Sequence, residues 1–191
     1  QRHNRAILDS RIIPMSQPFS TVSHDELHLG LLSEQILQLG ELLRSRGWSV
    51  SCAESCTGGG IAYALTSVSG SSDWFNQSWV TYSNDAKASM IGVQPDTLAK
   101  FGAVSEQVVE EMVTGTARNA KSQCAIAVSG IAGPGGGSDE KPVGTVWFGF
   151  QFGEQTVTVR QRFQGDRQAV RASAIVFAIN ELHQWLVANP V

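Results

Sequence analysis

The sequence predicts an α/β domain of three layers (α/β/α), in which helices cover both faces of a mixed, mostly parallel sheet. Helix-type and strand-type patterns alternate through the first two thirds of the chain, as they do when helices join parallel strands. Segment 124–129 is a continuous apolar run, typical of a strand buried on both faces. The strand patterns 144–152 and 156–163 have a connection too short for a parallel crossover, so we expect a late antiparallel hairpin.

The first part of the chain predicts two helices around a strand. A capping box formed by Ser23 and Glu26 precedes apolar residues at alternating steps of three and four, and this pattern predicts an amphipathic helix that ends near Gly47. Segment 48–53 alternates between apolar and polar residues and is rich in residues that favour a strand. Three consecutive glycines then fall at the start of a helix predicted over 57–67.

The middle and the end of the chain predict one more strand besides the apolar strand 124–129 and the hairpin, and four more helices. A strand is expected over 78–82, and Asn84 is placed to cap the short helix that follows it. Pro95 marks the start of another short helix. Ser105 caps the amphipathic helix after that, and the last helix is predicted over 166–186.

Length and charge limit the possible functions. The 191 residues fit one domain with a core of its own, which we place at 23–188. We interpret residues 1–22 as a leader or disordered arm, partly vector-derived, since the first residues lack periodicity and Met15 could be the natural start. A net charge of −3 argues against a nucleic-acid-coating or membrane-coating protein. Every apolar stretch is too short to span a bilayer.

The cysteines indicate neither a disulfide framework nor a metal site. Cys52, Cys56 and Cys124 are few and odd in number, which fits a reducing cytoplasm. Cys52 and Cys56 lie four residues apart with no histidine close by, so we expect buried thiols rather than zinc ligands. We therefore expect a cytoplasmic protein without a metal or a cofactor.

A serine beside a glycine-rich turn is the first candidate for chemistry. Ser55 follows the predicted strand 48–53 and precedes Thr57, Gly58 and Gly59. A nucleophile at a strand-to-helix turn is exposed, and backbone N–H groups of the turn can point at developing negative charge. The glycines let the backbone approach a substrate closely, as an oxyanion hole or a phosphate cradle requires. On the local pattern alone, a Ser55 that only caps the helix is an equally good interpretation.

Lys87 is the candidate base for this serine. A serine hydroxyl is a poor nucleophile until a base takes its proton, and a lysine with a lowered pKa can do so. Lys87 follows the strand predicted over 78–82, and open α/β sheets place their sites at the carboxyl ends of strands. Tyr82 ends that strand and could orient the lysine, carry a proton or stack on an aromatic ring. Taken singly, the two are also compatible with a solvated lysine and an ordinary strand residue.

Two further segments are candidates for substrate binding. The loop 130–142 is rich in glycine but lacks the P-loop pattern, so a substrate-binding loop and a long connection both stay open. Arg167 and Arg171 lie four apart on one face of the last helix. Their planar, forked donors suit a phosphate or a carboxylate.

Together these motifs resemble one known family. They are Ala-Glu-Ser-Cys-Thr-Gly-Gly at 53–59, Val-Thr-Tyr-Ser-Asn at 80–84 with Lys87, Gly-Ala-Val-Ser at 102–105, Ser-Gly-Ile-Ala-Gly-Pro at 129–134, Lys-Pro-Val-Gly-Thr-Val at 141–146 and Gly-Asp-Arg at 165–167. In this order they are similar to the CinA carboxyl-terminal domain family, over roughly residues 27–186. Stand-alone members of that family are nicotinamide-nucleotide amidases. We expect the stand-alone type, since 191 residues leave no room for the amino-terminal domain of larger CinA proteins.

The resemblance implies hydrolysis of the carboxamide of nicotinamide mononucleotide to nicotinate mononucleotide and ammonia, in pyridine nucleotide salvage. It implies a Ser–Lys pair, which falls on Ser55 and Lys87, and an arginine of the last helix, for which we choose Arg171. We add Tyr82 to the catalytic set. The other residues expected to bind the nucleotide are Cys56, Thr57, Gly58, Gly59, Asn84, Ser105 and Gly130. By analogy with the family we also expect a homodimer or a higher homo-oligomer.

Two alternatives stay open. Cys56 could be the nucleophile instead of Ser55, because a thiolate near a helix amino end is stabilised. The domain could also be a non-catalytic nucleotide-sensing or interaction module, as the competence-linked name of the family suggests. The acidic balance of the chain counts against direct DNA binding.

Overall fold

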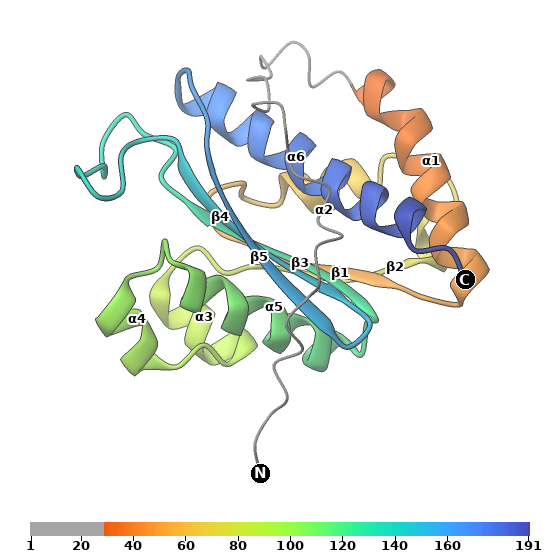
Figure 1. The fold of residues 1–191 in the computed structure, drawn as a ribbon, viewed down its shortest axis with the longest axis horizontal. Helices are drawn as coiled ribbons and strands as arrows, with labels where there is room; N and C mark the ends of the chain where they lie inside the picture. Colours follow the sequence, from red (N-terminus) through yellow and green to blue (C-terminus); the bar gives the residue numbers. More distant parts are fainter. Residues whose placement is uncertain (1–28) are drawn as a thin grey trace.

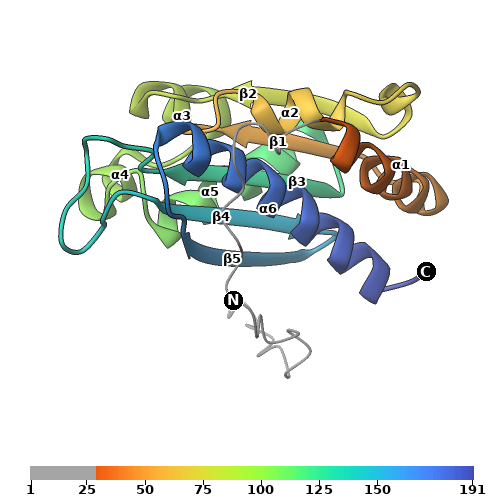
Figure 2. The same ribbon diagram turned by 90° about the horizontal axis from the view of Figure 1, so that it is seen from above.

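The strands form one five-stranded sheet. The structure is a computed structural model that describes residues 29–191; the predicted leader 1–22 and the capping box of Ser23 and Glu26 lie outside these residues. The strand order is β2-β1-β3-β4-β5, visible from above in Figure 2. The strands are β1 (Val50–Glu54), β2 (Phe75–Val80), β3 (Cys124–Gly130), β4 (Thr145–Phe152) and β5 (Gln155–Arg162).

The direction of the strands confirms the predicted mixed sheet. β1 is parallel to both of its neighbours, β2 and β3. β4 is antiparallel to β3 and to β5, so the predicted late hairpin is present and only β4 runs against the other strands. All of β1 is buried, and β3 is buried up to its last residue, as expected for strands covered on both faces.

Helices cover both faces of the sheet, which confirms the three-layer α/β/α prediction (Figure 1). One face carries α1 (Leu29–Arg46), α2 (Gly60–Leu65) and α6 (Arg167–Ala188); the other carries α3 (Asn84–Ile91), α4 (Pro95–Phe101) and α5 (Glu106–Ala120). Each face has its own apolar cluster. The cluster under α1, α2 and α6 is the larger, and its aromatic rings include Phe148 and Phe177, whose centroids lie 4.7 Å apart.

Glycines let α5 pack closely on the second face. A Cβ added at Gly115 of α5 would lie 1.8 Å from the carbonyl oxygen of Ile91, the last residue of α3. A Cβ added at Gly149 of β4 would lie 2.5 Å from the carbonyl oxygen of Val109. Helix α3 is therefore held against α5 at backbone distance, and this contact sets the position of the residues that α3 carries.

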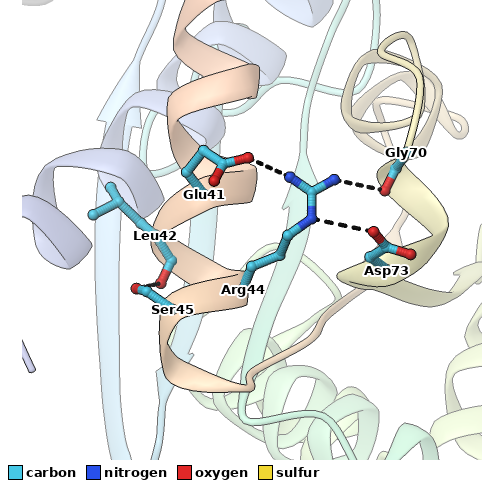
Figure 3. Close-up of polar contacts among 6 residues, drawn as sticks. All are labelled: Glu41, Leu42, Arg44, Ser45, Gly70 and Asp73. Atoms are coloured by element: carbon cyan, nitrogen blue, oxygen red, sulfur yellow. Dashed lines mark hydrogen bonds and ion pairs between the residues drawn. The ribbon is translucent and has the colours of Figure 1, made fainter.

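A polar cluster ties α1 to the turn that precedes β2 (Figure 3). Arg44 donates from Nε to Asp73 at 3.2 Å and from Nη2 to the carbonyl of Gly70 at 3.1 Å, and it also pairs with Glu41. The guanidinium thus joins the last turns of α1 to the start of the edge strand. This end of the sheet lies opposite the carboxyl ends of the parallel strands, where the candidate site was expected.

The structure corrects the details of four predicted elements. The helix predicted over 57–67 is the shorter α2, Gly60–Leu65, because residues 57–59 belong to the turn. The second strand is Phe75–Val80 rather than 78–82, because its pairing with β1 begins near Val50 and stops where β1 ends. The first strand covers Val50–Glu54 rather than 48–53, since residue 48 still closes the turn after α1. Asn84 does not cap α3: the side chain of Ser83 accepts the N–H of Ala86 instead.

Candidate functional site

The candidate nucleophile lies in a tight turn between β1 and α2. Ser55 follows the last residue of β1, and its N–H donates to Val128 of β3, which fixes the start of the turn to the sheet. The N–H of Gly58 donates back to the carbonyl of Ser55. Gly58 and Gly59 have φ values of 59° and 96°, a conformation that side chains disfavour. The sequence can therefore turn sharply here and leave Ser55 half-buried.

Lys87 reaches Ser55 from α3, which lies on the opposite face of the sheet from α2. Its Nζ lies 3.1 Å from Ser55 Oγ, 2.8 Å from the carbonyl oxygen of Thr81 and 3.4 Å from that of Tyr82. The side chain extends from α3, and the residue is only 1 % exposed. Burial lowers the pKa of Lys87 below the ordinary value and outweighs the opposing effect of Cys56. The structure thus brings together the two residues that the sequence singled out.

Tyr82 meets the site through its backbone rather than its side chain. Its carbonyl faces Lys87, whereas the residue as a whole is 59 % exposed. The phenol oxygen accepts a hydrogen bond from Nη2 of Arg167 at 3.1 Å. Nη1 of the same arginine donates to the carbonyl of Gly133 at 2.9 Å. Arg167 therefore joins Tyr82 to the glycine-rich loop.

Arg171 lies one helical turn further along α6 and contacts the nucleophile turn. Its Nε donates to the carbonyl of Cys56 at 3.1 Å, and Nη2 lies 3.2 Å from the position of a Cβ at Gly58. Its terminal nitrogens donate to no acceptor within residues 29–191. The two arginines thus have different surroundings. Both terminal nitrogens of Arg167 hydrogen-bond to other residues, whereas Arg171 binds the turn through Nε alone.

Cys56 is buried behind the turn. Burial, and after it the charge of Glu54, raises the pKa of its thiol to about 12, although a hydrogen bond from its own backbone N–H and the charges of Arg171 and Lys87 oppose this effect. A Cβ at Gly130, the last residue of β3, would lie 3.1 Å from Cys56 Sγ. The missing side chain at Gly130 therefore lets the end of β3 pack against the turn.

The remaining predicted residues lie at the starts of helices or in the turn. Ser105 caps α5 as predicted: its hydroxyl accepts from the N–H of Val108 at 3.3 Å and donates to the carbonyl of Gly102 at 2.8 Å. Asn84 is an exposed first residue of α3. In the described part of the chain, neither hydrogen-bonds to the Ser55 turn. Thr57 does belong to the turn and is 1 % exposed.

The sequence reasoning missed the contact that Glu54 makes with this turn. Glu54 is fully buried, and Thr57 Oγ1 donates to its carboxylate at 2.6 Å. A signal was present: α2 begins after glycines, without a capping side chain of its own, so another acceptor has to serve its first N–H groups.

No helix among residues 29–191 has both the length and the apolar character to cross a membrane. The same residues contain no cluster of three or more His, Cys, Asp or Glu side chains suited to a metal ion.

The fold and the site define a three-layer α/β/α domain with a buried lysine aimed at a serine in a glycine-rich turn. The chain belongs to the CinA C-terminal domain family, whose model matches residues 33–186. It is 52% identical over 159 residues to the nicotinamide-nucleotide amidohydrolase PncC of Enterobacter agglomerans, covering 83% of this chain and 97% of that protein. The PncC protein of Escherichia coli K12 is also 52% identical, over 83% of this chain and 94% of that protein.

A solved structure supports the same assignment of the fold. The CinA superfamily protein KP700603 from Klebsiella pneumoniae superposes with a TM-score of 0.78 at 43% sequence identity. The match covers 82% of this chain and 98% of that chain.

Proposed function

We propose that this protein is an amidohydrolase that converts nicotinamide mononucleotide to nicotinate mononucleotide and ammonia, in pyridine nucleotide salvage. The names of its relatives at 52% identity support the substrate. The observation that carries the chemistry is the 3.1 Å contact between Lys87 Nζ and Ser55 Oγ. Such a contact is what an activated serine nucleophile requires.

The surroundings of Lys87 suit a neutral amine. A neutral amine has two N–H groups and one lone pair, and the carbonyls of Thr81 and Tyr82 can only accept hydrogen bonds. If the two N–H groups face these carbonyls, the lone pair is left for the hydroxyl of Ser55. After proton transfer, the ammonium donates to all three oxygens. The same geometry therefore serves both protonation states.

The reaction proceeds through an acyl-enzyme. Ser55 Oγ attacks the carboxamide carbon while its proton passes to Lys87, and Lys87 then protonates the leaving ammonia. A water molecule attacks the ester, again with Lys87 as the base, and nicotinate mononucleotide is released. Within residues 29–191 the backbone N–H groups of Thr57 and Gly59 form no hydrogen bond to another residue, and the N–H of Cys56 meets only its own thiol, so the oxyanion can draw on N–H groups of this turn. One such donor contributes about 3–4 kcal/mol in the transition state.

Arg171 is the proposed anchor for the nucleotide. Its unpaired terminal nitrogens lie beside Gly58, and forked guanidinium donors suit a phosphate. Gly58 and Gly59 allow close approach, and Tyr82 offers an exposed ring for stacking. We keep Asn84, Ser105 and Gly130 in the proposed binding surface, with Ser105 and Gly130 acting through the loops that they hold.

Cys56 is a weaker nucleophile candidate than Ser55. With a thiol pKa raised to about 12 by burial, almost no thiolate is present near neutral pH, and the thiolate is the reactive form. The test is therefore a comparison: Cys56→Ala should keep activity within about threefold, whereas Ser55→Ala should abolish it.

Ammonia release from nicotinamide mononucleotide tests the whole proposal. Lys87→Ala should lower kcat by roughly 10²–10⁴-fold, the usual contribution of a general base, and Ser55→Ala should abolish activity because it removes the nucleophile. Lys100→Ala, at an exposed lysine of α4, is the matched control and should behave as wild type. A folded wild-type protein that releases no ammonia would favour the non-catalytic nucleotide-sensing module instead.

A further inference from the structure

Glu54 contacts both the turn that holds Ser55 and the start of α2. It is the last residue of β1 and directly precedes Ser55. Its carboxylate is fully buried and accepts three hydrogen bonds: from Thr57 Oγ1 at 2.6 Å, from the N–H of Ile61 at 2.8 Å and from the N–H of Ala62 at 3.0 Å. In the described part of the chain it has no ion-pair partner. A buried carboxylate is stable only when its oxygens are satisfied in this way.

The carboxylate replaces the missing cap of α2. Gly59, the residue before this helix, has a left-handed conformation and no side chain, so it supplies no acceptor. The N–H groups of Ile61 and Ala62 would otherwise lack partners inside the protein. A negative charge at this end also interacts favourably with the helix dipole. Glu54 thus joins both ends of the turn: the strand before Ser55 and the helix after Gly59.

This arrangement decides which N–H groups remain for a substrate. Those of Ile61 and Ala62 are used by Glu54, and those of Gly58 and Gly60 are used inside the turn. In the part of the chain that the structure describes, the N–H groups of Thr57 and Gly59 remain, and that of Cys56 meets only its own thiol. The hydrogen bond from Thr57 Oγ1 to Glu54 fixes the orientation of Thr57.

We propose that Glu54 is a positioning residue for the attack of Ser55. It holds the turn from inside, so that Ser55 Oγ stays at hydrogen-bond distance from Lys87 and the remaining N–H groups of the turn, those of Thr57 and Gly59 among them, are kept in place for the oxyanion. This inference rests on the amidohydrolase function proposed above. The charge of Glu54 also helps to keep the neighbouring Cys56 thiol protonated, which leaves serine as the nucleophile.

Glu54→Gln tests the inference with little change in size. The amide can accept hydrogen bonds through one atom only, so at least one of the three donors loses its partner. We expect kcat to fall about 100-fold, as a displacement of about 1 Å at a reacting atom does, while KM for nicotinamide mononucleotide stays within about threefold. Rates are measured well below the melting temperature of each variant, and circular dichroism checks that each variant is folded under the assay conditions.

Glu111→Gln is the matched control. Glu111 accepts from the hydroxyl of Thr97 at 2.9 Å and from the N–H of Gln94 at 3.2 Å. It therefore supports the start of α4 much as Glu54 supports α2, but it does not touch the Ser55 turn. We expect Glu111→Gln to lower the melting temperature and to leave kcat unchanged.

A second pair of variants and a second readout keep the test decisive. Thr57→Val removes one partner of Glu54 and should lower kcat, whereas Thr57→Ser keeps the hydroxyl and should restore it; this pair stands in if Glu54→Gln does not fold. Labelling of Ser55 by a small sulfonyl fluoride, followed by mass spectrometry with Ser55→Ala as blank, needs no natural substrate. Each label forms a Ser–O–S bond and releases fluoride, while Lys87 takes the proton.

The outcomes separate the two proposals. If wild type is labelled but releases no ammonia, the proposed substrate is wrong, and slower labelling of Glu54→Gln still supports the positioning role. If folded Glu54→Gln, or folded Thr57→Val, matches wild type in both kcat and labelling rate, the positioning role is overturned.

Discussion

Lys87 has a long apolar stem that ends in one amine. The stem is buried, and the amine lies among oxygen atoms. The residue is 1 % exposed, and its Nζ meets three oxygen atoms at the edge of the sheet. Burial disfavours the charged ammonium and so lowers the pKa of Lys87. A larger fraction of the amine is therefore neutral near physiological pH than for a lysine in water.

This lowered pKa predicts the pH dependence of the reaction. Protonated Lys87 cannot accept the proton of Ser55, so kcat/KM should rise with pH and level off above the pKa of Lys87, which lies below 10.5. Lys87→Arg should be inactive at every pH, because a guanidinium stays protonated. Ammonia release across the pH range measures both. A flat profile, or an active Lys87→Arg, would contradict the role of Lys87 as base.

The two arginines of α6 predict different kinetic effects. Arg171→Ala should raise KM for nicotinamide mononucleotide about 10- to 100-fold, since hydrogen bonds to a charged group contribute roughly 1.5–3 kcal/mol, and should change kcat much less. Arg167→Ala should affect KM less, because both of its terminal nitrogens already bind the protein. Steady-state kinetics of the two variants decide the point, and the reverse order of effects would assign the nucleotide to Arg167.

At the scale of elements, the site depends on how closely α3 packs against α5. Lys87 lies on α3, and Gly115 of α5 meets the carbonyl of Ile91 where α3 ends. Any side chain at Gly115 would place its Cβ against this backbone oxygen, and rotation about χ1 does not move a Cβ. The position of the base is therefore coupled to a contact that is far from Ser55 in sequence.

Gly115→Ala should consequently lower both stability and activity. Alanine favours a helix by about 1 kcal/mol over glycine, but the added Cβ forces the two helices apart, and overpacking costs about 1–3 kcal/mol. We expect a net decrease in the free energy of unfolding, measured by urea denaturation, with a lower kcat. Gly135→Ala, in a loop where nothing lies within 4 Å of the Cβ position, is the control for the effect of an unhindered methyl group on stability. A Gly115→Ala protein as stable as wild type would show that α3 can shift at no cost.

At the scale of the whole molecule, the site spans both helical layers. Ser55 comes from the end of β1, Lys87 from a helix on one face, and Arg171 from a helix on the other face. The carboxyl ends of the parallel strands bring them together, as is usual for α/β sheets. The site is therefore intact only when both layers are packed on the sheet.

The expected homodimer or higher oligomer stays a prediction at this scale. Light scattering coupled to size-exclusion chromatography should give at least twice the mass of one chain, which is 20.5 kDa. A single-chain mass that persists across protein concentrations, in a sample that retains activity, would contradict it.

Local sequence patterns were sufficient for most of the elements. Periodicity predicted the helices and the hairpin, because side-chain spacing on a helix or strand is a property of neighbouring residues. The limits of β2 were wrong, since parallel pairing with β1 decides them. The cap of α3 was also misplaced by one residue, from Ser83 to Asn84, because both residue types are good caps and only the backbone geometry distinguishes them.

The sequence by itself determined the fold class, the glycine-rich turn at Ser55 and the choice of Lys87 as its partner. Only the tertiary structure decided that these two side chains meet, that Glu54 closes the turn from inside and that Arg171 rather than Arg167 keeps free donors. The physical reason is distance along the chain: Ser55 and Lys87 are 32 residues apart, and Arg171 and Cys56 are 115 apart. Such contacts, and the burial that lowers the pKa of Lys87, arise from packing between layers, which no local pattern encodes.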